Sequence, residues 1–384
     1  MGAALGPGAA AAASSASASE AVDFYGAHQA GIATPTQQYL QFLSLDLAGG
    51  SEASDLQSVL QQLSHGASLI AQGRPVGALE TGGLAPVDTG EALGLKPSQA
   101  TITIGLGPHV FARVGLAHMR PAPLVDLPSF PGDQLQSGIS GGDIAVQVCA
   151  NDPQVAFHAV HDLIRLASPA AIPRWLQAGF GRIANSRSQT TPRNLIGFKD
   201  GTDNIKVEDR AQLDRFVWAD TPASPAWMRG GSYLVARRIS IQLTAWDQAS
   251  LDQQQDAIGR YKMSGAPMGE KREHQTPDLR ARRNGRYVIP GDAHIRLASP
   301  SYNNGERILR RGYSYVDGLA DGSPGTGLLF LVYQRDPRRQ FIPIQRRLSN
   351  ADALNAFAQS IASAIFACPP GASPGGYVGE TLFA

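Results

Sequence analysis

The feature that most constrains the fold of this chain is an order of predicted strands and helices that occurs twice. In the first half, short apolar runs are typical of strands, and longer stretches with apolar residues every three to four positions are typical of helices. Asp152 is a favoured cap residue, and Pro153 suits the first position of the helix that follows. Strands are predicted at 39–47, 101–106, 143–149 and within 174–183, and helices at 51–72 and after Asp152.

The second half repeats this strand–helix–strand–strand–helix–strand order. A last helix is predicted to begin at Ser349 and Asp352. Its apolar residues recur at helical spacing and are Leu354, Phe357 and Ile361. The other predicted elements are a helix at 250–261, which begins with the capping box Ser250 and Gln253, and strands at 232–243, 308–316 and 327–334.

Each half has the pattern of a ferredoxin-like α+β unit, in which an antiparallel sheet carries helices on one face. We therefore predict two ferredoxin-like domains, at 22–190 and 191–384, which meet in the sequence near Asp200. A length of 384 residues suits two domains that each bury a core. The segment 263–306 has little regular pattern, and loops of that length are usually functional or disordered.

Residues 1–21 differ from the rest of the chain, because Ala, Gly and Ser dominate them. Small residues of this kind occur near the cleavage sites of signal peptides, although a charged start and a long apolar centre are missing here. A flexible linker is the alternative interpretation. We favour the remnant of an export signal, which predicts a secreted or extracytoplasmic protein.

The overall composition excludes several classes of partner. A net charge of +1 gives no electrostatic reason to expect nucleic acid or an anionic membrane surface. No apolar run is long enough to cross a bilayer, so membrane insertion is not expected. The two cysteines, Cys149 and Cys368, fit neither a disulfide scaffold nor a thiolate metal site. They are predicted to be buried apolar residues, with a single disulfide between them as the alternative.

The stretch 194–202 carries a lone carboxylate between two glycines. Gly197 and Gly201 flank Asp200, and glycine lets a backbone approach a ligand closely. An Asp–Gly pair by itself is typical of a turn, which is the ordinary interpretation. A functional role is favoured only in combination with other residues, of which His294 and the Arg310–Arg311 pair are the candidates.

The eight histidines give no clear metal motif. His158 and His161 lie three apart on a predicted helix, within reach of a shared ligand, but the sequence shows no third partner near them. No cluster has zinc spacing, and no nucleophile elbow is present. Gly105 and Gly107 follow a strand without a third glycine, so a dinucleotide site is weakly indicated. His294 would by default be structural.

Several motifs taken together resemble the dye-decolourising peroxidase family over nearly the whole chain. The most specific is the sequence GFKDGT at 197–202, which His294 and Arg310 follow at the spacing of that family. The subgroup that it resembles most contains exported peroxidases and deferrochelatases that use the twin-arginine route, although the twin-arginine pair is absent here. The remaining matching motifs lie at 24–32, 264–269, 309–315 and 327–330.

The resemblance implies haem b (iron protoporphyrin IX) bound mainly by the C-terminal domain, with His294 as the proximal iron ligand. It implies that Asp200 is the distal proton-transfer residue and Arg310 the distal arginine. Arg311 is the alternative, because a slip of one residue along a strand exchanges its two faces. The spacing of the family motif favours Arg310.

Further residues are expected to contact the haem. Leu328 and Phe330, two apart on a predicted strand, are expected to restrict the distal pocket to small molecules. Arg260 and Arg296 are candidates for the haem propionates, since a guanidinium group binds a carboxylate bidentately. The other candidates for haem-edge contacts are Gly201, Thr202, Asp203 and Ser299–Ser301.

The resemblance implies a peroxidase that reduces hydrogen peroxide and oxidises a dye, a phenol or a related organic reductant. Because a dye is too bulky for the pocket, oxidising equivalents are expected to reach the surface through aromatic residues, with core packing as the alternative role. The alternatives are a haem- or iron-handling protein of the deferrochelatase type and a haem-free ferredoxin-like binding module. A homo-oligomer is compatible with all three. The candidate relay residues are Tyr313, Tyr315, Trp218, Trp227 and Trp246.

Overall fold

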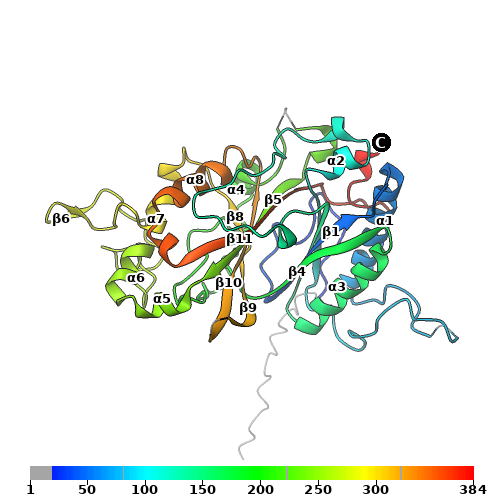
Figure 1. The fold of residues 1–384 in the computed structure, drawn as a ribbon, viewed down its shortest axis with the longest axis horizontal. Helices are drawn as coiled ribbons and strands as arrows, with labels where there is room; N and C mark the ends of the chain where they lie inside the picture. Colours follow the sequence, from blue (N-terminus) through cyan, green and yellow to red (C-terminus); the bar gives the residue numbers. More distant parts are fainter. Residues whose placement is uncertain (1–19, 81, 222–223, 321) are drawn as a thin grey trace, which may run out of the picture.

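The computed structural model is organised around one antiparallel sheet that closes on itself (Figure 1). It describes residues 20–80, 82–221, 224–320 and 322–384, so the predicted leader lies almost wholly outside the described residues. The strands of the sheet are β1 (Tyr39–Leu47), β2 (Thr101–Leu106), β3 (Ile144–Ala150), β4 (Ala171–Arg182), β5 (Ser232–Ile241), β8 (Leu309–Arg310), β9 (Tyr313–Ala320), β10 (Ser323–Gln334) and β11 (Ala358–Cys368).

The order of strands along the sheet is β5-β11-β2-β3-β1-β4-β9-β10-β8. Because β10 also pairs with β5, the strands from β5 to β10 form a closed, barrel-like ring. The two halves of the chain meet in this ring at two short junctions, where Ala367 pairs with Leu106 and where Phe180 pairs with Ser314. The long ladders therefore lie within each half, and the junctions between the halves are narrow.

The first half has the predicted order of elements. The helices α1 (Ala53–Ile70) and α3 (Pro153–Ala167) lie side by side and cover one face of β1 to β4 (Figure 1). The Asp152 carboxylate accepts the backbone N–H groups of Gln154 and Val155, which confirms the predicted cap. Short helices in the connections are α2 (Val110–Arg113), η1 (Ala117–Met119) and η2 (Ser137–Ile139).

The second half carries more short elements than the first. The predicted capping box of Ser250 and Gln253 opens α6, which ends at Ile258 because Gly259 takes a left-handed conformation with φ of +87°. The predicted strand at 232–243 ends at Ile241, and a helix begins two residues later. The helices are α4 (Arg210–Phe216), η3 (Ala226–Met228), α5 (Leu243–Gln248), α6 (Leu251–Ile258), α7 (His294–Leu297), η4 (Pro300–Tyr302), α8 (Phe341–Ala351), η5 (Ala353–Ala356) and η6 (Glu380–Leu382).

The prediction of a last helix beginning at Ser349 was wrong. Ser349 lies near the end of α8, Leu354 lies in the short helix η5, and Ile361 lies in β11. Strand β11 pairs with β5 along almost its full length, from Ala358 to Cys368. These long-range hydrogen bonds decide the conformation, because local spacing alone does not separate a short apolar helix from a buried strand.

The core has two large parts, one on each face of the sheet, and a smaller third cluster of Ile196, Phe198, Trp246 and Ile258. Leu43 and Leu45 of β1 pack with α1 and α3, whereas Leu40 and Phe42 pack in the ring interior against residues from the other half of the chain. Both faces of β1 are therefore covered, which explains its nearly continuous apolar sequence. Interior residues from the two halves include Trp175, Leu234, Tyr313, Leu331, Tyr333 and Phe366.

The two cysteines lie in the ring interior as free thiols. Cys149 and Cys368 are both buried and unpaired with each other, which confirms the prediction of buried apolar residues and excludes the alternative disulfide. Burial raises the pKa of the Cys368 thiol well above its ordinary value, so it stays protonated and unreactive.

The long segment 263–306 extends outward from the second half (Figure 1). Its regular parts are the hairpin of β6 (Arg282–Arg283) and β7 (Arg286–Tyr287), and the short helices α7 and η4. It is therefore ordered locally by turns. Among the described helices, none combines the length and the apolar character that crossing a bilayer requires.

Candidate functional site

The stretch 194–202 folds as a tight turn that presents Asp200. Gly201 has φ of +107°, and a Cβ built on it would lie 2.6 Å from backbone atoms of Ala184. Only glycine fits so close an approach between two backbone segments. The N–H of Asp200 donates to the carbonyl of Pro192 at 2.9 Å, which closes the turn. The Asp200 carboxylate is thus held by a backbone that has little room to move.

Asp200 and Arg310 form a direct ion pair. Arg310 Nη1 donates to Asp200 Oδ1 at 2.7 Å, and the amide of Asn194 donates to Asp200 Oδ2 at 3.4 Å. The two charged side chains keep exposed fractions of 16% for Asp200 and 24% for Arg310, so small molecules can reach them. A carboxylate beside a permanently charged guanidinium is suited to move a proton next to a stabilised negative charge.

Strand register explains why Arg310, and not Arg311, meets Asp200. Arg310 lies opposite Val332 in the pairing of β8 with β10, so its side chain shares a face with Leu328, Phe330 and Val332. Arg311 points into the ring interior, where it is buried and donates to the carbonyl of Thr34 and, at 2.7 Å, to the side chain of Gln37. The face that carries Arg310 is the one on which Leu328 and Phe330 are half-buried.

Asn204 holds the backbone of Arg310 on both sides. Its Oδ1 accepts the N–H of Arg310 at 3.0 Å, and its Nδ2 donates to the carbonyls of Arg310 at 2.8 Å and Ala184 at 3.1 Å. Asn204 is buried, and it follows the Gly201 turn directly. It therefore links the turn that presents Asp200 to the strand that presents Arg310.

We expect Asn204→Ala to lower both stability and activity. The change leaves three backbone groups, one buried and two half-buried, without their partner, at a cost of about 2 kcal/mol or more, and it loosens the spacing between Asp200 and Arg310. The measurements are thermal unfolding and the turnover of hydrogen peroxide. Asn204→Asp, which keeps the acceptor and loses the donor, should fall between the wild type and Asn204→Ala. An Asn204→Ala protein equal to the wild type in both measurements would contradict this role.

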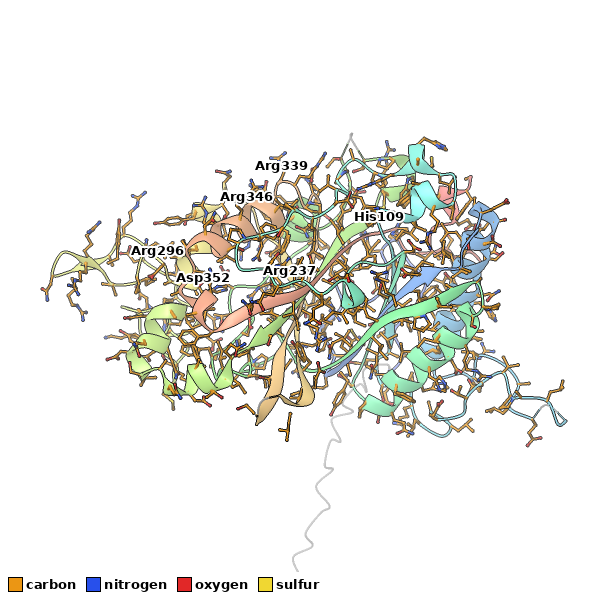
Figure 2. The ribbon with its side chains drawn as sticks, viewed as in Figure 1. His109, Arg237, Arg296, Arg339, Arg346 and Asp352 are labelled. Carbon is orange, nitrogen blue, oxygen red and sulfur yellow. The ribbon has the colours of Figure 1, made fainter. Side chains whose placement is uncertain are left out.

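His294 lies at the start of α7, and a buried carboxylate holds its ring. His294 Nδ1 donates to Asp352 Oδ2 at 2.6 Å, while Asp352 Oδ1 accepts the N–H of Leu354 at 2.9 Å. The N–H of Ala353 donates to the carbonyl of Asp292 at 3.0 Å, which fastens the loop before His294 to the segment that carries Asp352. Asp352 directly follows α8, which is in contact with α7, and it is labelled in Figure 2.

The charges of the ion pair act on His294. Burial acts to lower the pKa of His294, but the charge and hydrogen bond of Asp352 outweigh it, so the pKa is raised overall. Arg310 also lowers the pKa of the His294 ring, and Asp200 raises it. Because the effect of a charge weakens with distance, Asp200 and Arg310 belong to the same region of the protein as His294.

The residues that border this region fit a haem group. With Nδ1–H donated to Asp352, the Nε2 atom of His294 is left as the lone-pair nitrogen, which is the usual arrangement of a metal-binding imidazole. The His294 side chain is 37% exposed when no ligand covers it, so its ring can reach a ligand. Asp200 offers a carboxylate that can move a proton, and Arg310 offers a fixed positive charge beside it.

Of the candidates for propionate contacts, Arg296 has most of its donors engaged within the protein. Its guanidinium donates to the carbonyls of Pro290, Leu279 and Ile289 and to the Tyr302 hydroxyl, which occupies four of its five N–H groups. These partners all lie in the segment 263–306, so Arg296 shapes the loop around α7. A contact between Arg296 and a propionate stays a prediction.

The other candidates for haem contacts also have hydrogen-bond partners within the protein. Arg260 is buried and donates to the carbonyls of Gly265 and Glu273, and the nearby charges of Asp203 and Arg310 act on its pKa, which burial lowers. Arg260 therefore lies near the site with donors to spare. Thr202 donates to Glu273 at 3.0 Å, Asp203 accepts from Arg307 at 2.6 Å, and Ser299 bonds to Ser301 at 2.8 Å. Their roles toward haem stay predictions.

The structure does not place the proposed relay residues at the surface. The side chains of all five are buried, and most have a polar partner inside the protein. Trp246 contacts the stretch that presents Asp200, because its indole N–H donates to the carbonyl of Ile196 at 3.1 Å and its ring meets Phe198 edge to face. A relay of oxidising equivalents stays a prediction for all five residues, which are Tyr313, Tyr315, Trp218, Trp227 and Trp246.

Sequence reasoning missed two residues of the site. Asp352 was taken only as a helix cap, and Asn204 was not singled out. The only signal for Asp352 was its type, a carboxylate able to orient an imidazole, since its partner lies 58 residues away. Asn204 gave the weaker signal of an amide two residues beyond the turn formed by Asp200, Gly201 and Thr202.

Comparison with known proteins identifies the family. The chain matches the family models described as Dyp-type peroxidase, N-terminal, at residues 29–181 and Dyp-type peroxidase, C-terminal, at residues 191–373. The structure of a DyP-type peroxidase from Streptomyces coelicolor is 41% identical, with a TM-score of 0.88, and the match covers 95% of this chain and 97% of that one. The chain therefore belongs to the Dyp-type peroxidase family.

Two further relatives refine this placement. Ferric DtpA from Streptomyces lividans is 40% identical, with a TM-score of 0.88, and the match covers 95% of this chain and 98% of that one. The deferrochelatase of Escherichia coli is 36% identical over 368 residues, which cover 94% of this chain and 86% of the relative. Peroxidases and deferrochelatases are thus both similar to nearly the whole chain.

Proposed function

We propose that this protein is a haem peroxidase that binds haem b, reduces hydrogen peroxide and oxidises an organic reductant such as a dye or a phenol. The observation that carries the proposal is the arrangement of His294 held by Asp352, with the Asp200–Arg310 pair bordering the same region. Membership of the Dyp-type peroxidase family supports it.

The bound haem would supply the iron at which hydrogen peroxide binds and is reduced. His294 would hold the iron through Nε2, while Asp352 accepts a hydrogen bond from Nδ1–H and raises the electron-donating power of the imidazole. Asp200 would accept a proton from one oxygen of hydrogen peroxide on its carboxylate and return it to the other oxygen, which could then leave as water. Arg310 keeps its charge and would stabilise the negative charge that develops on the departing oxygen.

The face that carries Arg310 also limits what can enter. Leu328 and Phe330 lie on β10 on the same face as Arg310, and their bulky side chains would narrow the space there to a size that suits water and peroxide better than a bulky donor. An organic reductant would then be oxidised from outside the pocket. Because the five predicted aromatic relays are buried, they can carry an electron through the protein but cannot form its surface contact.

The test uses the protein reconstituted with haem. We expect a Soret band, a rapid change of that band on adding one equivalent of hydrogen peroxide, and peroxide-dependent oxidation of an anthraquinone dye. Haem-free protein treated in the same way is the control. A protein that takes up no haem would leave only a haem-free binding module, and one that takes up haem without responding to peroxide would exclude the peroxidase.

The similarity to the deferrochelatase of Escherichia coli supports a second candidate, release of iron from haem. The two activities have different products. Iron release leaves an intact metal-free porphyrin, whose fluorescence rises, whereas peroxidase turnover oxidises the donor and retains the iron. Fluorescence without dye oxidation would favour the second candidate, and dye oxidation without fluorescence the first.

Two broader predictions remain proposals. Within each half, the strands have the order expected of a ferredoxin-like sheet, β4-β1-β3-β2 in the first and β11-β5-β10-β9 in the second. This supports two ferredoxin-like domains at 22–190 and 191–384. A secreted or extracytoplasmic location rests on the composition of residues 1–21 alone.

A further inference from the structure

A cluster of buried charged side chains lies in the first half, far along the chain from the residues of the haem site. Asp88 comes from the loop between α1 and β2, and His158 and Asp162 lie one turn apart on α3. The exposed fractions are 2% for Asp88, 5% for His158 and 0% for Asp162. Carboxylates and imidazoles this deeply buried are normally paired or bound to a metal.

The His158 ring is oriented so that Nε2 points at both carboxylates. On its other side, Nδ1 donates to Glu91 Oε2 at 3.0 Å. Nε2 lies 3.7 Å from Asp88 Oδ2 and 3.4 Å from Asp162 Oδ2. A metal-binding histidine typically donates its second ring N–H to a carboxylate in this way, which leaves the first nitrogen as a ligand.

One of the facing oxygens lacks a hydrogen bond. Asp162 Oδ1 accepts the N–H of Thr89 at 3.1 Å, but among the residues that the structure describes Asp162 Oδ2 has no hydrogen-bond partner, although Asp162 is fully buried. Asp88 Oδ2 accepts the N–H of Val76 at 2.8 Å, which leaves it a second lone pair. Arg165, the nearest guanidinium, lies 3.8 Å from the other oxygen of Asp162. The convergent atoms are therefore acceptors that still need a positive partner.

We propose that Asp88, His158 and Asp162 bind a divalent transition-metal ion, and that Zn²⁺ fits the cluster best. The three ligand atoms lie within 4.8 Å of one another. In a tetrahedral zinc site with bonds of about 2.1 Å, neighbouring ligand atoms are about 3.4 Å apart, close to the 3.4 and 3.7 Å separations from Nε2. Two carboxylates and one imidazole, without thiolate, suit Zn²⁺ better than a soft ion such as Cu⁺.

The surroundings leave room for a fourth ligand. A cavity of about 60 Å³ adjoins the cluster, and Asp88 and His158 contribute to its lining. That volume holds a few water molecules, so a water can complete the coordination of the ion. Three protein ligands and one open position would also let an exchangeable anion bind there.

His161, which the sequence paired with His158, lies outside the cluster. Its Nδ1 bonds to Glu91 Oε1 at 2.6 Å, and its side chain is 42% exposed. Glu91 therefore bonds to both histidines. The further partners of His158, which the sequence did not show, are Asp88 and Asp162. A bound metal would hold the loop that contains Asp88 against helix α3 more firmly than the ion pairs alone do.

The alternative is a metal-free ion pair, in which His158 carries two protons and donates to one carboxylate. To separate the two, Zn²⁺ is titrated by calorimetry into full-length, haem-loaded protein that has been dialysed against chelator. We expect one Zn²⁺ per chain. Asp162→Asn and His158→Gln should each weaken binding at least about tenfold. His161→Gln, a histidine change one turn away on the same helix, is the matched control and should bind as the wild type does.

X-ray absorption of the wild-type zinc complex serves if the buried variants do not fold. We expect a shell of nitrogen and oxygen ligands with a single imidazole. Wild-type protein that binds no Zn²⁺, a shell with sulfur or several imidazoles, or equal losses in His161→Gln and Asp162→Asn would each overturn the proposal. Because no residue of the haem site takes part, these outcomes are independent of the peroxidase assays.

Discussion

Arg310→Ala is expected to slow the reaction with hydrogen peroxide by a factor of about 100 to 1000. Arg310 is the cation that meets Asp200 at 2.7 Å on the face shared with Leu328 and Phe330. Removing it takes away the charge that stabilises the departing oxygen, and it also leaves Asp200 without its partner. The measurement is stopped-flow absorbance of the haem-loaded variant at a series of peroxide concentrations.

Three further variants make this result interpretable. Arg310→Lys keeps a positive charge without the planar donors and should recover part of the rate. Arg339→Ala, labelled in Figure 2, removes an arginine whose side chain is 76% exposed and should react as the wild type does. Asp200→Ala is expected to slow the same step. If Asp200→Ala has little effect while Arg310→Ala has a large one, Asp200 is not the base.

Asp352→Asn is expected to reduce haem affinity or peroxide turnover by about 10-fold to 100-fold. An amide in place of the carboxylate no longer attracts the Nδ1 proton of His294, so the ring loses both its orientation and its preferred tautomer. His294→Ala removes the ring altogether and should have the larger effect. Haem titration followed by the position of the Soret band measures both.

A neighbouring carboxylate provides the matched control. Asp292→Asn changes an exposed side chain two residues before His294 and keeps the backbone carbonyl that bonds to Ala353. Haem binding and turnover should stay unchanged in this variant. Asp352→Asn with the affinity and activity of the wild type would mean that Asp352 only caps the helix η5.

Much of the fold was predictable because local pattern and tertiary pairing agree in most strands. In β1 and β3, apolar runs with turn residues at their ends already indicate buried strands. In β11 the local pattern and the tertiary pairing disagree. Its many Ala and Ser residues have no strong strand preference. Leu354 and Phe357, which precede the strand, and Ile361 within it recur at helical spacing. Only the pairing with β5, which lies more than a hundred residues earlier, makes the segment a strand.

The candidate site was predictable only in part. The motif spacing indicated His294, Asp200 and Arg310, and the structure brings the last two into contact. It could not indicate the contact of Asp352 with His294 or the partners of Arg296, since both depend on where a loop without regular pattern folds back. Side chains that orient other side chains are recruited by geometry, and sequence spacing carries little information about them.

The most direct test of the central claim is a crystal structure of the haem-loaded protein. We predict that His294 Nε2 binds the iron, with Nδ1 still bonded to Asp352, and that Asp200 and Arg310 lie together on the opposite side of the porphyrin. A structure in which another residue binds the iron, or in which Asp200 and Arg310 lie away from the haem, would contradict the account.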